Sequence, residues 1–334
     1  MNAIQSLPAL AGLIVVALAF DFLNGLHDTA NSIATLVSTR MLQPRYAVIW
    51  AAFFNFVAFL LFGVHVARTV GVGIVAADIM DAHVIFGALM GAISWNLITW
   101  WAGIPSSSSH ALIGGLLGAG ITKAGIGSIV WFGVLTTGAF IVLSPLLGFF
   151  LALALVLLVS WAFVRATPRA VEGTFHWLQF ASASLISLGH GGNDAQKTMG
   201  IIAVLLFSQG RLGGEFYVPF WVVITCQTAM ALGTLVGGWR IVRTVGSKIT
   251  RLTPVQGCCA STAGAVMLFA ATYLGIPVST THTVTGSVIG VGAARKVSAV
   301  RWRIATNIVI AWIITLPASA AMAAGFYFLS KLAP

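Results

Sequence analysis

The chain has 334 residues, of which 59% are hydrophobic and only 7% are charged. A soluble domain carries about 25% charged residues, so this composition excludes a water-soluble globular protein and predicts one embedded in a lipid bilayer. The net charge of +10 lies mainly in loops between apolar runs, which indicates anchoring at the cytoplasmic membrane surface and excludes nucleic acid as a partner. Apolar runs of about 20 residues predict an all-α polytopic membrane protein and not a β-barrel.

The first apolar run, residues 8–39, has no basic segment before it and is predicted to be a membrane span rather than a cleaved signal peptide. It contains "NGLHDTANSIA" at 24–34, which places the ionisable residue Asp28 at membrane depth. Ionisable residues are costly in a bilayer and are therefore functional candidates. The polar residues that flank this aspartate are Asn24, His27 and Asn31.

The segment 83–122 contains a second unusual motif, "GIPSSSSH" at 103–110. Its proline predicts a turn, and its hydroxyls are suited to cap the helix that follows. A helix N-terminus exposes unpaired N–H groups and the positive end of the helix dipole, so the motif predicts an anion site. His110 either donates a hydrogen bond to that anion or packs between helices. The hydroxyl candidates are Ser107, Ser108 and Ser109.

Both motifs recur later in the chain. "HGGNDAQKTMG" at 190–200 follows the first signature by 166 residues, and "GIPVSTTH" at 275–282 follows the first serine motif by 172. Because order and spacing are kept, we predict one transmembrane domain over 1–334 built from two homologous halves, 1–165 and 172–334. The corresponding candidates are Asn193, Asp194, Gln196 and Lys197 in the signature, and Ser279, Thr280, Thr281 and His282 in the serine motif.

Loop charges predict that the two halves have opposite orientations. Twelve of the 17 Lys and Arg residues lie in four loops that we therefore assign to the cytoplasm: 40–45, 164–174, 240–254 and 295–303. Segment 255–294 then enters and leaves from the cytoplasmic side, and its counterpart 83–122 enters and leaves from the other side. This is an inverted-topology repeat with both termini outside the cytoplasm, and many transporters place their substrate site where such repeats meet.

Three apolar segments are longer than one membrane span: 8–39, 128–163 and 175–207. Broken or strongly tilted helices are expected there. The predicted fold is therefore an all-α polytopic membrane protein with two inverted-topology repeats, broken helices and Pro-Ser helical hairpins. Asp21, whose repeat equivalent is Ser187, is expected nearer the membrane interface and ranks below the other aspartates.

The repeated aspartates predict a cation site. Carboxylate and amide oxygens, with backbone carbonyls freed beside Gly25, Gly191 and Gly192, suit Na⁺ or a proton. A purely structural pairing of Asp194 with Lys197, one turn further on, is the alternative, but it would leave the first aspartate unexplained. The histidines are too dispersed for a transition-metal site, and neither a metal nor a cofactor is predicted. The cation-coupling candidates are Asp28, Asp194, Asn24, His27 and Asn193.

Two symmetry-related helix N-termini together with Lys197 favour one shared oxyanion ligand. An intramembrane hydrolase would need one activated serine and one base, which a duplicated polyhydroxyl motif does not provide, so no catalytic residue is predicted. A passive channel would not need a buried carboxylate in each half. Coupling of the anion to a cation explains both features.

The signature and the hairpin motif, present in each half and in order, resemble those of the inorganic phosphate transporter (PiT) family over nearly the whole chain. "NGLHDTAN" and "GHGGNDAQK" are most similar to its bacterial low-affinity branch. The resemblance implies alternating-access import of inorganic phosphate, coupled to a cation, by a homodimer in the inner (plasma) membrane. The predicted phosphate ligands are Ser107, Ser108, Ser109, Ser279, Thr280, Thr281, Asn31, Gln196 and Lys197.

Three positions depart from the wider family pattern: His27, where many members have Asn, and Gln196 and Lys197, where the signature would give Ala and Asn. An imidazole titrates near neutrality, so these changes favour H⁺ over Na⁺ as the coupling ion. The bacterial branch is associated with H⁺ symport of phosphate, in some members as a metal-phosphate complex. An Na⁺-coupled phosphate symporter and a sulfate permease of the same family remain alternatives.

Overall fold

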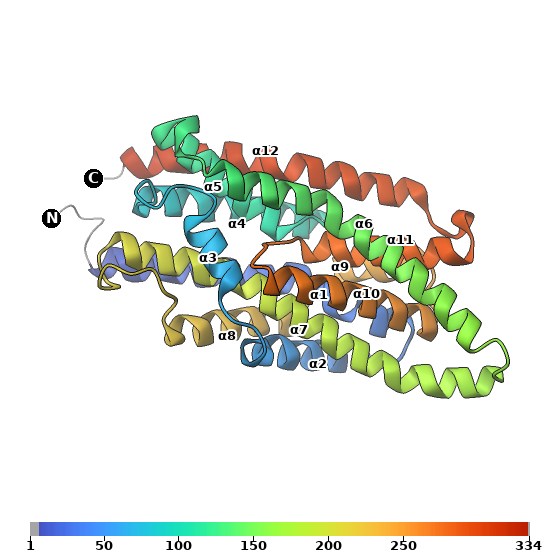
Figure 1. Cartoon of the computed structure of the whole chain (residues 1–334). Helices are drawn as coiled ribbons and strands as arrows, with labels where there is room; N and C mark the ends of the chain where they lie inside the picture. The colour runs from blue at the N-terminus through green and yellow to red at the C-terminus, as the bar shows by residue number, and fades with distance from the viewer. Residues whose placement is uncertain (1–6, 333–334) are drawn as a thin grey trace.

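The computed structural model describes residues 7–332, which fold almost entirely into α-helices, as the composition predicts (Figure 1). The first half contains α1 (Leu7–Ser38), α2 (Pro44–Val57), α3 (His65–Val72), α4 (Ala82–Ala102), α5 (Ser108–Ala124) and α6 (Trp131–Ala162). The second contains α7 (Pro168–Ser208), α8 (Phe220–Val236), α9 (Trp239–Arg243), α10 (Pro254–Tyr273), α11 (Thr280–Arg295) and α12 (Trp302–Leu332). Short helical turns lie at Ala58–Leu60, Ile126–Ser128, Thr244–Lys248 and Val297–Ala299.

Within residues 7–332, five helices are long and apolar enough to cross a membrane: α1, α4, α6, α10 and α12. Two further pairs reach that length only as bent units, α2 with α3 at 84° and α8 with α9 at 63°. Large apolar side chains point outward, and α6 presents Phe132 and Trp161, which are 83% and 79% exposed, near its two ends. Aromatic residues at both ends of an apolar helix are typical of the two membrane–water interfaces.

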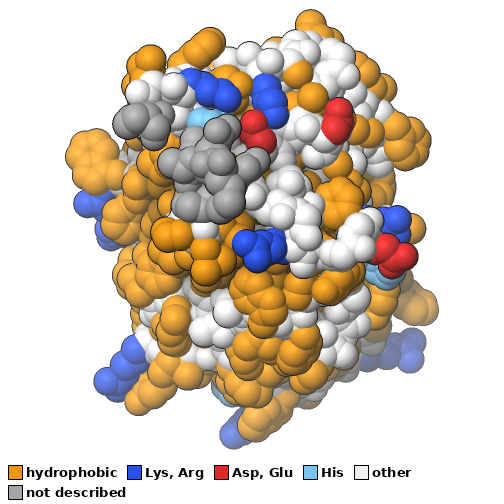
Figure 2. Space-filling view, turned by 90° about the vertical axis from the view of Figure 1, so that its left-hand side faces the viewer, with side chains coloured by type: hydrophobic (Ala, Val, Ile, Leu, Met, Phe, Trp, Pro, Cys, Tyr) orange, Lys and Arg blue, Asp and Glu red, His pale blue; other side chains and the backbone are white. Residues whose placement is uncertain are grey.

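Corresponding helices of the two halves run in opposite directions (Figure 1). α1 and α6 run away from the end of the bundle where the chain begins, whereas α7 and α12 run towards it, so that α1 begins and α12 ends on the same side. Figure 2 looks onto that side, where Lys, Arg, Asp and Glu side chains are mixed among hydrophobic ones. This arrangement is the inverted-topology repeat expected from the loop charges.

The breaks lie elsewhere than expected. α1, α6 and α7 are continuous over 32, 32 and 41 residues, so of the two alternatives, broken or strongly tilted helices, the long apolar segments are not broken; the bent units are α2 with α3 and α8 with α9. The glycines beside the aspartates do not interrupt the helix. They allow the backbone of a neighbouring helix to approach closely. A Cβ at Gly25 would lie 2.1 Å from the carbonyl oxygen of Met230, and a Cβ at Gly191 would lie 2.4 Å from that of Asn55.

The last long helix of each half packs against the hairpin of the other half. α6 packs against α10 and α11, and α12 packs against α4 and α5. Glycines four residues apart in α5 and α11 allow close backbone approach, which is how helices associate in lipid. A Cβ at Gly118 would lie 2.2 Å from the carbonyl oxygen of Ala320, and a Cβ at Gly290 would lie 2.3 Å from that of Phe149. The equivalent contacts of Gly114 and Gly286 are equally tight.

Candidate functional site

Each serine motif forms the tip of a helical hairpin. Gly103 after α4 and Gly275 after α10 have φ of 67° and 70°, a left-handed conformation that ends a helix readily at glycine. Ser107 and Ser279 cap α5 and α11, and each accepts the backbone N–H three residues further on at 3.2 Å. The capping predicted from the motifs is thus confirmed, and it leaves the following hydroxyls facing the centre of the bundle.

The carboxylate of Asp28, on α1, receives hydroxyls from both hairpins. Ser108 Oγ donates to Asp28 Oδ2 at 2.7 Å, and Thr281 Oγ1 donates to Oδ1 at 3.1 Å. His27 Nδ1 lies 2.9 Å from the same Oδ1. The aspartate is 2% exposed, so the two motifs that are 172 residues apart in sequence meet at one buried carboxylate.

Asp194, on α7, is the second buried carboxylate. Thr280 Oγ1 donates to Asp194 Oδ2 at 2.9 Å, and Lys197 donates to Oδ1. The ammonium of Lys197 also donates to Ser109 Oγ and, at 2.8 Å, to the carbonyl oxygen of Val278. Lys197 is only 2% exposed. A buried lysine held by one carboxylate and by both hairpins is a fixed positive charge at the centre of the site.

Asn31 and Lys197 occupy equivalent positions in the repeat, and each reaches the hairpin of the opposite half. Asn31 Nδ2 donates to Thr280 Oγ1 and to Thr281 Oγ1, both at 3.0 Å. Lys197 reaches Ser109 in the first hairpin. The halves are therefore interlocked by side chains as well as by helix packing.

His27 and Asn193, also equivalent in the repeat, connect each signature to the hairpin of its own half. His27 Nε2 lies 3.1 Å from Thr99 Oγ1 and 3.3 Å from Ser106 Oγ. Asn193 Nδ2 donates to Thr272 Oγ1 at 3.0 Å and to the carbonyl oxygen of Ile276 at 3.2 Å. Both side chains, expected to serve the cation, also contact the hairpin of their own half.

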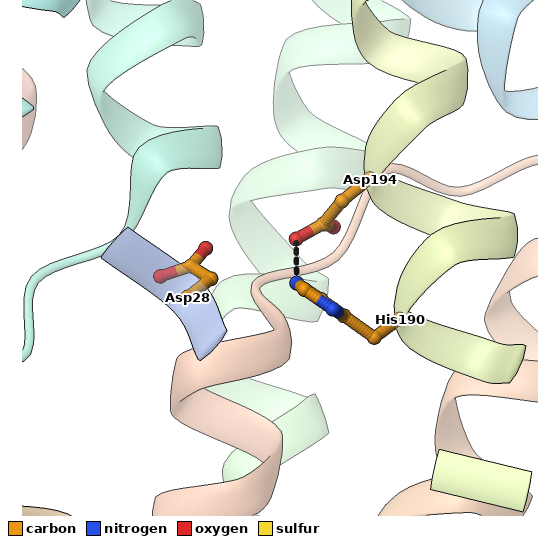
Figure 3. Close-up of side chains that lie close together, drawn as sticks. All are labelled: Asp28, His190 and Asp194. Carbon is orange, nitrogen blue, oxygen red and sulfur yellow. Dashed lines mark ion pairs between the residues drawn. The ribbon is translucent and has the colours of Figure 1, made fainter. Parts of the chain in front are cut away.

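A cluster of Asp28, His190 and Asp194 lies at the centre of the site (Figure 3). Their ligand atoms lie within 4.8 Å of one another, and all three residues are buried. His190 Nε2 is 3.3 Å from Asp194 Oδ2, and its Nδ1 is 3.3 Å from Ser32 Oγ. His190 flanks the second aspartate in the sequence, and its position four residues earlier on a helix suggests the contact, but it is not among the site residues predicted above.

Two predicted residues lie outside the hydroxyl cluster. Gln196, expected to bind the anion, accepts the N–H groups of Val66 at 2.9 Å and Ala67 at 3.3 Å and so caps the start of α3. Asn24, expected beside Asp28, instead neighbours Asp21. Asp21, expected nearer the membrane interface, is fully buried beside Thr198 of α7 and Cys226 of α8.

His110 and His282 meet between the hairpins. Their ring centroids are 4.2 Å apart, and His282 stacks on Trp312 at 3.6 Å. Among residues 7–332, no hydroxyl or carboxylate bonds to either ring. Of the two roles considered, helix packing is the one that the geometry supports.

Inverted helical repeats that meet at buried carboxylates, hydroxyls and one ammonium define a membrane transporter. The sequence pattern of the Phosphate transporter family, PHO4, matches residues 24–323. The chain belongs to this family, as its repeated motifs predict, and is a transporter and not an enzyme.

Two relatives and one solved structure match this chain over almost their whole length. A protein of Rhizobium meliloti (strain 1021) described as "Probable low-affinity inorganic phosphate transporter" is 71% identical over 332 residues, 99% of each chain. A protein of Bacillus subtilis (strain 168) with the same description is 45% identical over 327 residues, 96% of each chain. The solved structure titled "The sodium-dependent phosphate transporter" superposes with a TM-score of 0.89 at 27% identity, covering 97% of this chain and 99% of that one.

Proposed function

We propose that the protein imports inorganic phosphate across the inner (plasma) membrane, coupled to a cation, by alternating access between the two halves. Both chain ends are placed outside the cytoplasm in this proposal, in accord with the loop charges. A homodimer is the proposed assembly. The observation on which the function rests is that hydroxyls of both hairpins bond to the two buried carboxylates.

Charge explains why the anion needs a cation. With neutral histidines, Asp28, Asp194 and Lys197 give the site a net charge of −1, and phosphate makes it more negative. An uncompensated buried charge costs several kcal/mol, so the anion binds favourably only when a cation or proton neutralises a carboxylate. The affinities of phosphate and cation are then raised reciprocally.

The hairpin hydroxyls connect binding of the cation to binding of phosphate. Ser108, Thr280 and Thr281 now donate to carboxylates. A neutralised carboxylate is a weaker acceptor, and these hydroxyls are then released to donate to phosphate oxygens. Lys197 and the N-terminal N–H groups of α5 and α11 complete the proposed anion site.

The proposed coupling ion is H⁺. Each carboxylate has a histidine beside it, His27 at 2.9 Å and His190 at 3.3 Å, and an imidazole is a side chain that proteins use to move protons. Na⁺ is the alternative, since the same carboxylates are hard oxygen ligands. If phosphate enters as a metal complex, Asp28, His190 and Asp194 are the proposed ligands of that metal.

Sulfate is the rival substrate. Protonated phosphate donates a hydrogen bond to a carboxylate such as Asp28 or Asp194, whereas sulfate only accepts. Discrimination between phosphate and sulfate is therefore expected to depend on the carboxylates, and in equilibrium binding Asp28→Asn is expected to reduce the ratio of phosphate affinity to sulfate affinity.

Proteoliposomes containing the purified protein provide the test. Labelled phosphate and sulfate are compared under an imposed pH gradient, and then under an Na⁺ gradient, with and without Mg²⁺ or Mn²⁺. We expect phosphate uptake driven by the pH gradient, and its loss in Asp28→Asn and Asp194→Asn. Uptake of sulfate alone would refute phosphate as the substrate. Na⁺-driven uptake that does not depend on the pH gradient would refute H⁺ as the coupling ion. Asp78→Asn, at an exposed loop position, is the control.

A further inference from the structure

Asp21 is a third buried carboxylate, separate from the two in the hydroxyl cluster. It is 0% exposed, and neither oxygen has a hydrogen-bond partner among residues 7–332. It lies seven residues before Asp28 on α1, so the two share a helix face about 10 Å apart along the axis. Asp21 is therefore nearer than Asp28 to the start of α1.

The surroundings of Asp21 are polar but contain no dedicated counter-charge. Asn24 on its own helix and Thr198 on α7 flank the carboxyl, and Asn24 Oδ1 and Thr198 Oγ1 are themselves buried without a hydrogen-bond partner. The thiol of Cys226 on α8 is the third neighbour. The polar neighbours of the carboxyl are thus an amide, a hydroxyl and a thiol, none of which carries a positive charge, so the ionised acid is costly there unless a cation or a proton neutralises it.

The charged groups that act on this carboxyl are Asp194 and Lys197 of α7, and the titratable thiol beside it is Cys226. Lys197 is already bonded to Asp194 and to both hairpins, and Asp194 opposes a second negative charge. An ionised Asp21 would be a buried anion without a partner. Burial without a counter-charge therefore favours the neutral, protonated acid in the arrangement described here.

We propose that Asp21 is a proton-carrying residue of the transport cycle, distinct from the carboxylates that bond to the hairpins; this rests on the proposed function. A hydronium ion from the outer side protonates the carboxylate before the site closes: one of its O–H bonds breaks, the carboxyl O–H bond forms, and a water molecule leaves. When the site opens inward, the carboxyl O–H bond breaks, the proton passes to water on the cytoplasmic side, and the carboxylate remains. One proton then crosses with each transported phosphate through this residue.

The test separates coupling from transport in proteoliposomes. A pH difference of one unit supports about tenfold phosphate accumulation for each coupled proton. Asp21→Asn mimics the permanently protonated acid. We therefore expect its phosphate accumulation to be about tenfold lower than that of wild type for each unit of pH difference. Exchange of labelled for unlabelled phosphate at equal pH is expected to stay within about twofold of wild type, because the hairpins and Lys197 are intact. Ser187→Ala, at the repeat-equivalent position, is the matched control and should change neither assay.

The outcomes distinguish this inference from the proposed function. Wild-type accumulation by Asp21→Asn under a pH gradient would overturn the proton role while phosphate transport stands. Should that variant fail to fold, Asp21→Glu is expected to keep coupling and to shift the pH profile of exchange, and an unchanged profile would overturn the inference. Wild-type protein that transports no phosphate would refute the proposed function itself.

Discussion

Ser108 and Thr281 donate to the two oxygens of the same carboxylate, Asp28, although they come from hairpins of opposite halves. One side chain on α1 is thereby hydrogen-bonded to both hairpin tips. Any movement that separates the tips must break one of these two hydrogen bonds. Neutralising the aspartate weakens both at once, which is a direct way to connect cation binding to movement of the halves.

Lys197 is expected to be essential for both stability and binding. Lys197→Met leaves Asp194 as an unpaired buried charge, which costs about 3–5 kcal/mol of the free energy of unfolding. The double variant Lys197→Met with Asp194→Asn is expected to recover most of that stability, because no charge is left unpaired, but not phosphate binding. Denaturation in detergent micelles and equilibrium dialysis of labelled phosphate measure the two quantities. Recovery of binding in the double variant would contradict the assignment of Lys197 as an anion ligand.

The peripheral pair of Asp81 and Lys123 is expected to contribute less to stability than the buried pair of Asp194 and Lys197. Burial alone would raise the pKa of Asp81, but the hydrogen bond from Lys123 at 2.8 Å and the backbone N–H of Val84 hold that pKa below the ordinary value of 3.8. The pair thus contributes stability above pH 3.8, which is lost as the pH falls through the lowered pKa. Because Asp81 is 38% exposed, Asp81→Asn should cost less than about 1 kcal/mol at pH 7.

Unfolding of Asp81→Asn and wild type, followed from pH 7 to pH 3, measures that difference. The two stabilities are expected to converge at the acidic end. A difference that grows on acidification would show that the carboxylate is destabilising, contrary to its contacts. Asp78→Asn, at an exposed position without an ion pair among residues 7–332, should show no such trend.

The glycines of α5 and α11 are expected to tolerate no side chain. A leucine at Gly118 or Gly290 would meet backbone of α12 or α6 at 2.2 or 2.3 Å from its first atom. Overpacking of this kind costs about 1–3 kcal/mol or more. Gly127→Leu, where the space is open, is the control. Thermal unfolding in detergent should show both interface variants less stable than the control, and equal midpoints would contradict close packing of these helices.

His282 is expected to act through its ring and not through a hydrogen bond. His282→Phe keeps the stacking on Trp312, so phosphate uptake should stay within about threefold of wild type. His282→Ala opens a cavity between the hairpins and should cost about 2–4 kcal/mol of stability. Uptake kinetics and denaturation measure the two effects. A large rise in KM for phosphate in the phenylalanine variant would show that the imidazole contacts the anion.

Local chemistry made part of this site predictable from sequence. Turn and cap residues act within a few positions of themselves, so "GIPSSSSH" and "GIPVSTTH" predicted two hairpin tips without knowledge of the fold. The repeat then predicted that Asp28 and Asp194 are equivalent. The continuous course of α1 and α7 was not predictable in this way, because Gly25 and Gly191 are accommodated by packing against helices distant in sequence.

Residues whose roles depend on a distant helix escaped prediction. Asp21 looks interfacial by its place in the first apolar run and is buried only because α7 and α8 lie over it. Gln196 sits in the signature but bonds to the first turn of α3. The approach of His190 to Asp28 depends on the packing of α1 against α7, which no local pattern specifies.

The packing of α6 and α12 against the hairpin of the opposite half has a consequence for biosynthesis. The hairpin of α4 and α5 leaves the ribosome long before α12, the helix that covers it, has been synthesised. During that interval its glycine-lined face is open to lipid or to the insertion machinery. The polar hairpin tip cannot reach its partners on α7 and α11 until those helices are inserted. The hairpins are therefore expected to pack into their final positions late, once the last helix has been inserted. A chain truncated before α12 should be held by chaperones or degraded.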